Sequence, residues 1–142
     1  MKNPVIYVFL NKSLEMSTGK AASQAAHAAA QSIANNDNMG DNIEWATAIH
    51  KTVIVLQARD EAHLRNIQDY LAQRTIKSQL VIDEGVNEIP SHTITALVTP
   101  IMEKNEDADK LMSTFALYND RVDPRLEDMI GFIRNLSPVF PR

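Results

Sequence analysis

Three polar side chains recur at helical spacing in an alanine-rich stretch near the start of the chain. Lys20, Gln24 and His27 are separated by four and then three residues, so in a helix all three project from one stripe. The remaining positions of the stretch are almost all alanine, which lets such a helix lie very close to a sheet. The spacing therefore predicts one helical face that holds a cation, an amide and an imidazole in fixed positions.

Each of these side chains also has a purely structural interpretation. A lysine at the start of a helix is usually a solvated surface charge whose stem covers apolar neighbours. On the structural interpretation, Gln24 does no more than form a hydrogen bond to a neighbouring loop. His27, on a helix made mostly of alanines, can be a packed histidine bonded to a backbone carbonyl. The residue types alone leave both interpretations open.

The elements around this stretch are those of a layered α/β domain. Residues 5–10 form a continuously apolar run, which is typical of a strand covered on both faces. Ser17 or Thr18 can cap the following helix, Gly19 allows its tight start, and the helix is predicted to end near Asn35.

The rest of the chain continues the alternation of strands and helices. Apolar runs and helical stripes predict strands at 51–57, 77–83 and 93–99, and helices at 43–49, 61–73, 105–118 and 126–136. Strands separated by helices favour crossover connections and a mixed or largely parallel sheet. At 142 residues the chain is long enough for one domain with its own core.

Composition excludes several classes of protein. Cysteine is absent and the four histidines lie far apart in sequence, so we expect no metal site and no disulfide. No apolar run approaches the roughly 20 residues of a membrane span. No signal-peptide pattern precedes the first strand, which leads us to expect a cytoplasmic protein. The net charge of −4 gives no broad basic excess, so binding to nucleic acid would need a local cluster of Lys and Arg.

Three separated segments follow a known order of motifs. The first fits the pattern M-x-x-G-K-x-x-x-Q-x-x-H-A with Met16, Gly19, Lys20, Gln24, His27 and Ala28. The second contains Trp45, the strand 51–56, and then Asp60, Glu61 and Leu64. The third contains Asp83, Gly85, Ile89, Thr93 and Thr95. Together, over about residues 5–100, they resemble the type 2, or archaeal and eukaryotic type, family of peptidyl-tRNA hydrolases.

This resemblance implies an α/β fold with a four-stranded mixed β-sheet flanked by helices, commonly as a homodimer. It implies hydrolysis of the ester between a peptide and the terminal ribose of tRNA, with no metal and no cofactor. By position, Lys20 would stabilise negative charge on the attacked carbonyl or a nearby phosphate, helped by the helix dipole. Asp83 would orient or deprotonate the attacking water, and Thr95 would hold that water or a ribose hydroxyl.

The resemblance also suggests residues that support the substrate. Gln24 and His27 would do so from the helical stripe, and Thr93 from the strand that carries Thr95. Asn87 stands where the family has a threonine, and its amide can still donate and accept hydrogen bonds. The structural alternative for the two threonines is that they alternate with apolar neighbours, as in any half-buried strand.

The chain departs from the family pattern at two places. Asn11 and Ser13 stand where an arginine and an aspartate are usual, and Val86–Glu88 replaces Arg-Thr-Gln. Basic side chains are thereby lost, and Glu84 adds a carboxylate beside Asp83, which would repel phosphate. The alternative to a hydrolase of peptidyl-tRNA, or of a related aminoacyl ester, is therefore a catalytically inactive member that binds a ligand or a protein.

The domain boundaries follow from the same comparison. We expect residues 1–100 to form the domain that resembles the hydrolase family. Residues 101–142 would form a helical C-terminal extension that packs on the same domain, because their apolar residues fall at helical spacing. The alternative is that this extension serves as an interaction element.

Overall fold

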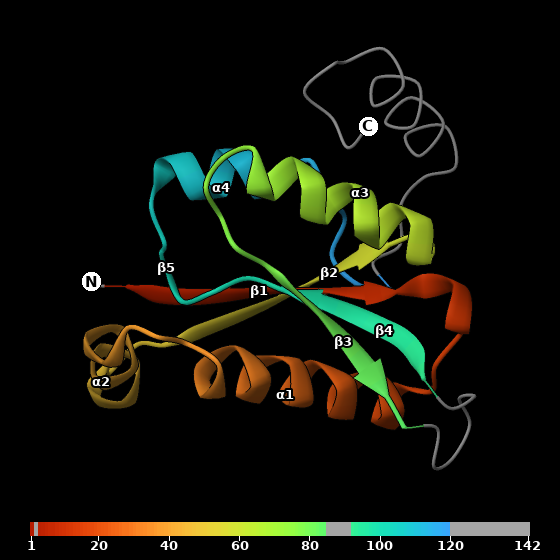
Figure 1. The fold of residues 1–142 in the computed structure, drawn as a ribbon, viewed down its shortest axis with the longest axis horizontal. Helices are drawn as coiled ribbons and strands as arrows, with labels where there is room; N and C mark the ends of the chain where they lie inside the picture. Colours follow the sequence, from red (N-terminus) through yellow and green to blue (C-terminus); the bar gives the residue numbers. More distant parts are fainter. Residues whose placement is uncertain (2, 85–91, 120–142) are drawn as a thin grey trace.

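The structure, a computed structural model, describes residues 1, 3–84 and 92–119. One β-sheet lies between two helical layers, with α1 and α2 on one face and α3 and α4 on the other (Figure 1). The strands are β1 Pro4–Asn11, β2 Thr52–Ala58, β3 Gln79–Asp83, β4 Thr93–Val98 and β5 Met102–Glu103. The helices are α1 Thr18–Ala34, α2 Met39–Thr47, α3 Glu61–Ala72 and α4 Glu106–Met112, with a short 3-10 turn at Lys12–Leu14.

The sheet has the order β2-β1-β4-β3, and β5 pairs with the start of β1. Strands β1 and β2 are parallel, whereas β1–β4, β3–β4 and β1–β5 are antiparallel. The predicted mixed sheet flanked by helices is therefore confirmed. The two-residue strand β5 was not predicted, because a run this short has no periodicity.

Strand β1 is the centre of the sheet. Each of its eight residues is buried, since the sheet continues on both sides of β1 and helices cover both of its faces. This explains why residues 5–10 are apolar without alternation. The odd-numbered residues join the core under α3 and α4, and the even-numbered residues join the core over α1.

The alanines of α1 face the sheet at close range. Ala21 and Ala28 are buried in the core between α1 and the sheet. Near the end of the helix, the Ser32 hydroxyl donates a hydrogen bond to the Thr99 carbonyl at 2.6 Å. Small side chains thus let the backbone of α1 approach the sheet, as the composition of this helix predicts.

Two predicted helices have different bounds in the structure. Helix α2 begins at Met39 rather than near residue 43, because the side chain of Asn38 caps it by accepting a hydrogen bond from the Asp41 N–H. Helix α4 ends at Met112 rather than near residue 118. The chain then pairs with the edge of β2, where Gln57 N–H donates to the Ala116 carbonyl at 3.0 Å.

Residues after Pro100 contribute to the core on the α3 side. The rings of Phe9 and Phe115 meet edge to face, with centroids 5.0 Å apart, and Met112 is buried in the same cluster. The predicted helix at 126–136 lies outside the described residues. Among the helices that the structure describes, none is long and apolar enough to cross a membrane.

The contact between Phe9 and Phe115 gives a test of how far the cooperative core extends. We expect Phe115→Ala to lower the free energy of unfolding by about 3–5 kcal/mol, because it removes a buried ring and leaves a cavity. Leu117→Ala is the matched control. Its side chain is 52% exposed, and it should cost about 1 kcal/mol or less. Urea unfolding measures both, and equal losses for the two variants would contradict the assignment of Phe115 to the core.

Candidate functional site

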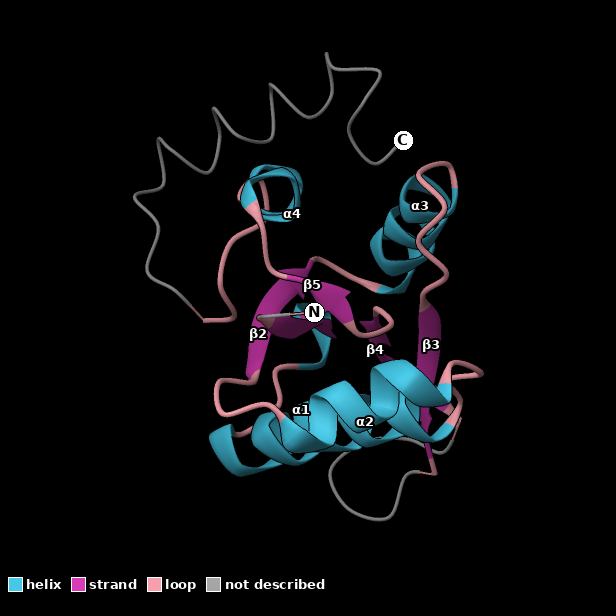
Figure 2. Cartoon of the chain, turned by 90° about the vertical axis from the view of Figure 1, so that its left-hand side faces the viewer, coloured by secondary structure: helices cyan, strands magenta, loops and turns pink. Residues whose placement is uncertain are grey.

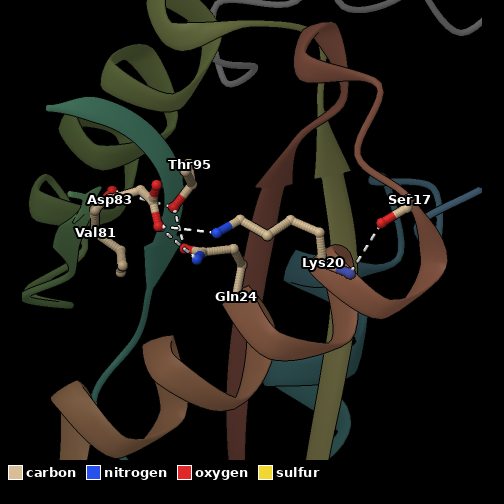
Figure 3. Close-up of polar contacts among 6 residues, drawn as sticks. All are labelled: Ser17, Lys20, Gln24, Val81, Asp83 and Thr95. Carbon is tan, nitrogen blue, oxygen red and sulfur yellow. Dashed lines mark hydrogen bonds and ion pairs between the residues drawn. The ribbon is translucent and has the colours of Figure 1, made fainter. Parts of the chain in front are cut away.

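The start of α1 faces the end of β3 and the middle of β4 (Figure 3). The Ser17 side chain caps α1 by accepting a hydrogen bond from the Lys20 N–H at 3.2 Å. A Cβ on Gly19 would meet no atom within 4 Å. The space around Gly19 therefore does not itself require a glycine, and the serine cap fixes this end of α1.

Four side chains from these elements form one hydrogen-bonded chain. Asp83 Oδ1 accepts from Lys20 Nζ at 3.2 Å and from Gln24 Nε2 at 3.0 Å. The Thr95 hydroxyl in turn donates to Gln24 Oε1 at 2.6 Å. Figure 3 shows the three contacts side by side, with the two helical side chains reaching across to the strands.

These groups are largely removed from water. The side chains of Lys20 and Asp83 are 12% and 10% exposed, and Gln24 and Thr95 are buried. The interpretation of Lys20 as a solvated surface charge is therefore wrong. Gln24 bonds to two strand residues rather than to a neighbouring loop. Because each of these four side chains is hydrogen-bonded to another, their relative positions are fixed before any ligand binds.

A β-bulge brings Thr95 into this site. Val81 pairs with Ala96 while the next residue, Ile82, pairs with Ile94, so Thr95 is the extra residue of the bulge. Simple alternation from Leu97, which packs on the α3 side, would turn Thr95 away from α1. The bulge shifts the alternation, and the Thr95 hydroxyl faces Gln24 instead. Bulges commonly re-aim a side chain next to a functional site.

The structure distributes the other predicted site residues differently. Thr93 is half-buried and is the register partner of Asp83 on β4, next to the hydrogen-bonded chain. His27 is exposed, and its side chain makes no hydrogen bond within the part of the chain that the structure describes. The interpretation of His27 as a packed, bonded histidine is therefore wrong. Asn87 lies outside the described residues.

Asn11 and Ser13 support the site in a way that the sequence did not reveal. Asn11 is buried, and its side-chain amide donates to the Ile94 carbonyl at 3.0 Å, one residue before Thr95. Its Oδ1 accepts from the Ser13 N–H and hydroxyl at 3.1 and 2.6 Å. The signal available in the sequence was an asparagine at a strand end with a serine two residues later, which is typical of an Asx turn.

The arrangement combines a cation with a carboxylate in a sheltered position. A lysine ammonium has three hydrogen-bond donors, and a carboxylate has about four acceptor sites. The pair can therefore act on further groups, with Lys20 donating to a developing oxyanion and Asp83 accepting from a water. Within residues 1, 3–84 and 92–119, no group of three His, Cys, Asp or Glu side chains is placed to hold a metal ion.

Comparison with known proteins assigns the chain to a family. Residues 5–118 match the family model described as Peptidyl-tRNA hydrolase PTH2. A peptidyl-tRNA hydrolase of Pyrobaculum aerophilum is 35% identical over 112 residues, which cover 74% of this chain and 89% of that protein. A peptidyl-tRNA hydrolase of Methanopyrus kandleri is 31% identical over 106 residues, which cover 73% and 89%. The chain therefore belongs to the PTH2 family of peptidyl-tRNA hydrolases.

Proposed function

We propose that this protein hydrolyses the ester that joins a peptide to the terminal ribose of tRNA, without a metal ion. The observation that carries the proposal is the contact between Lys20 and Asp83, which are 63 residues apart in sequence but 3.2 Å apart in space. Family membership and the names of both relatives support the same reaction.

Lys20 and Asp83 have complementary roles in this reaction. A water molecule attacks the ester carbonyl while the Asp83 carboxylate accepts a proton from it. The carbonyl oxygen becomes an oxyanion, and the Lys20 ammonium stabilises this charge at the positive end of α1. The carbon–oxygen bond to the ribose then breaks, and the ribose oxygen takes up the proton that Asp83 accepted, which restores the carboxylate. An ester is an activated bond, so one cation and one positioned water suffice, and the lysine supplies the charge that a metal would otherwise provide.

Gln24 and Thr95 position the carboxylate. The Gln24 amide holds Asp83 Oδ1, and the Thr95 hydroxyl fixes the orientation of that amide by donating to its oxygen. Since the hydrogen of Thr95 is directed to Gln24, its hydroxyl can contact a water or a ribose hydroxyl only as an acceptor. We therefore assign the catalytic roles to Lys20 and Asp83, and a positioning role to Thr95.

Three further residues are proposed to contact the substrate. Thr93 lies beside Asp83 on the neighbouring strand. His27 continues the helical stripe of Lys20 and Gln24 into solvent, where its imidazole can meet the RNA. Asn87 is assigned through its motif position alone.

We also propose that the protein acts in the cytoplasm as a homodimer. Light scattering on the purified chain measures the assembly, and a monomeric mass would contradict the dimer.

A catalytically inactive binding module is the second candidate. The observation that favours it is the exposed carboxylate of Glu84 next to Asp83, because a second negative charge opposes the approach of phosphate. Turnover separates the two candidates. Saturable release of peptide from peptidyl-tRNA would exclude the binding module, whereas binding without release would exclude the hydrolase.

We expect Lys20→Ala to lower kcat for hydrolysis of a model peptidyl-tRNA by about 10²–10³-fold, because the oxyanion loses its cation. Lys110→Ala is the matched control, since it removes the same charge from an exposed position on α4, across the sheet from the site. It should change kcat by no more than about twofold. Assays with and without a metal chelator complete the test.

Two results would contradict this assignment. Equal activity in Lys20→Ala and the wild type would remove the lysine from the mechanism. Loss of activity in the wild type after chelation, with recovery on adding a divalent cation, would show that the reaction depends on a metal. Circular dichroism of each variant establishes that the fold is retained.

The role of Thr95 predicts a different pattern. Thr95→Val keeps the side-chain shape but leaves the buried Gln24 oxygen without its donor, which should lower kcat about tenfold and cost about 1–3 kcal/mol of stability. Thr95→Ser restores the hydroxyl and should recover most of kcat. If serine restores stability but not turnover, or if valine leaves turnover unchanged, Thr95 does not position the carboxylate.

A further inference from the structure

Strand β3 is an edge of the sheet, and it ends at the proposed catalytic carboxylate. Among the strands of residues 3–84 and 92–119, only β4 pairs with β3 in the order β2-β1-β4-β3, and Figure 2 shows no other described strand on the far side of β3. The backbone groups on that side are therefore available unless side chains cover them. An edge of this kind can accept another extended chain.

The register defines which residues of β3 face outward. Backbone groups of an antiparallel strand point alternately to the paired strand and away from it. The extra residue of the bulge lies in β4, so the alternation along β3 is unbroken. The Leu80 carbonyl points outward, because it accepts a hydrogen bond from the Gln31 side chain. Ile82, two residues later, points the same way, whereas the Asp83 carbonyl turns inward to accept from the His92 N–H at 2.7 Å.

Side chains cover the two outward carbonyls that precede Ile82 on this edge. The Ser78 carbonyl accepts from Gln68 Nε2 at 3.3 Å, and the Leu80 carbonyl accepts from Gln31 Nε2 at 3.1 Å. Among the described residues, none outside the strand pairing is hydrogen-bonded to Ile82, whose side chain is 49% exposed. Proteins normally protect their sheet edges, so an outward carbonyl that no described side chain covers, beside the proposed catalytic Asp83, points to a ligand.

We propose that Ile82 binds the peptide part of the substrate as an added strand, an inference that rests on the proposed function. The Ile82 N–H and carbonyl exchange two hydrogen bonds with one residue of the peptide. The residue that carries the ester cannot be this one, because its carbonyl is the group under attack. The pairing therefore falls on the penultimate residue of the peptide.

The spacing along the two chains fits this register. Ile82 is one residue from Asp83, and the penultimate residue is one residue from the ester, so both steps span about 3.3 Å in extended chains. Recognition through the backbone does not depend on peptide side chains. This suits a hydrolase that must accept peptides of any sequence, and it requires an N–H on the penultimate residue.

A matched set of substrates tests the proposal on the full chain. Three forms of peptidyl-tRNA are compared: an N-acetylated aminoacyl ester, the same ester extended by a penultimate glycine, and the same extension with N-methylglycine. We expect the glycine extension to lower KM by up to about tenfold, the effect of one net hydrogen bond, because the acetyl group already supplies the penultimate carbonyl and the glycine adds the N–H. The N-methyl group should abolish the gain, and kcat should stay within about twofold, because these bonds form in the ground state as well.

Substitution of Ile82 gives the complementary test. Ile82→Pro removes the outward N–H, which takes no part in the pairing with β4, so the edge strand should tolerate it. It should raise KM about tenfold for the glycine-extended substrate and for the unextended ester alike, because the acetyl carbonyl stands where the penultimate carbonyl accepts from the Ile82 N–H. Ile82→Ala keeps the N–H and is the control. If the proline variant does not fold, the N-methylglycine substrate still tests the other bond of the pair, from the peptide N–H to the Ile82 carbonyl, on the wild-type chain.

The outcomes separate this inference from the proposed function. If the wild type hydrolyses all three substrates with the same KM, the added strand is wrong while the hydrolase assignment stands. If the N-methylated and unmethylated extensions behave alike, the register is wrong, and so is the proposal. If no substrate is hydrolysed, the proposed function fails and this inference fails with it.

Discussion

The partly buried ion pair between Lys20 and Asp83 sets the requirements for the rest of the fold. Removing two charges from water costs several kcal/mol per ion unless their geometry and additional hydrogen bonds compensate. The compensation here is Gln24, which bonds Asp83 and is itself bonded by Thr95. These contacts need the start of α1 within a side-chain length of β3 and β4. The alanines of α1 allow this close approach, and bulky residues at the same positions would separate the charges.

Register within the sheet is the second constraint. Thr95 and Ala96 both turn toward α1, although successive residues of a regular strand face opposite sides. The bulge therefore allows one strand to supply a polar group to the site and apolar groups to both cores. Asn11 bonds the Ile94 carbonyl beside this irregularity and joins the end of the central strand to it. A substitution at Asn11 would thus act on the site through the backbone of β4, without touching a substrate.

Local patterns in the sequence predicted the parts of the site that depend on one element. The shared stripe of Lys20 and Gln24 follows from helical geometry, and the mixed sheet follows from the alternation of strands and helices. The contact with Asp83 came from the resemblance between motifs, because no local pattern relates residues 63 positions apart. The bulge at Thr95 was not predictable, since Thr93 and Thr95 fit a regular strand equally well. The early end of α4 also depends on a distant partner, the edge of β2.

In the proposed reaction, the resting ion pair also explains how Lys20 favours the transition state over the bound substrate. The ester carbonyl is neutral in the ground state, when the negative charge near Lys20 resides on Asp83. As Asp83 takes the proton from water, its charge is neutralised and an equal charge appears on the carbonyl oxygen. The ammonium exchanges one anionic partner for another and is never left without one. Its stabilisation is thus directed to the charge that forms during the reaction, which is the condition for raising kcat rather than only tightening binding.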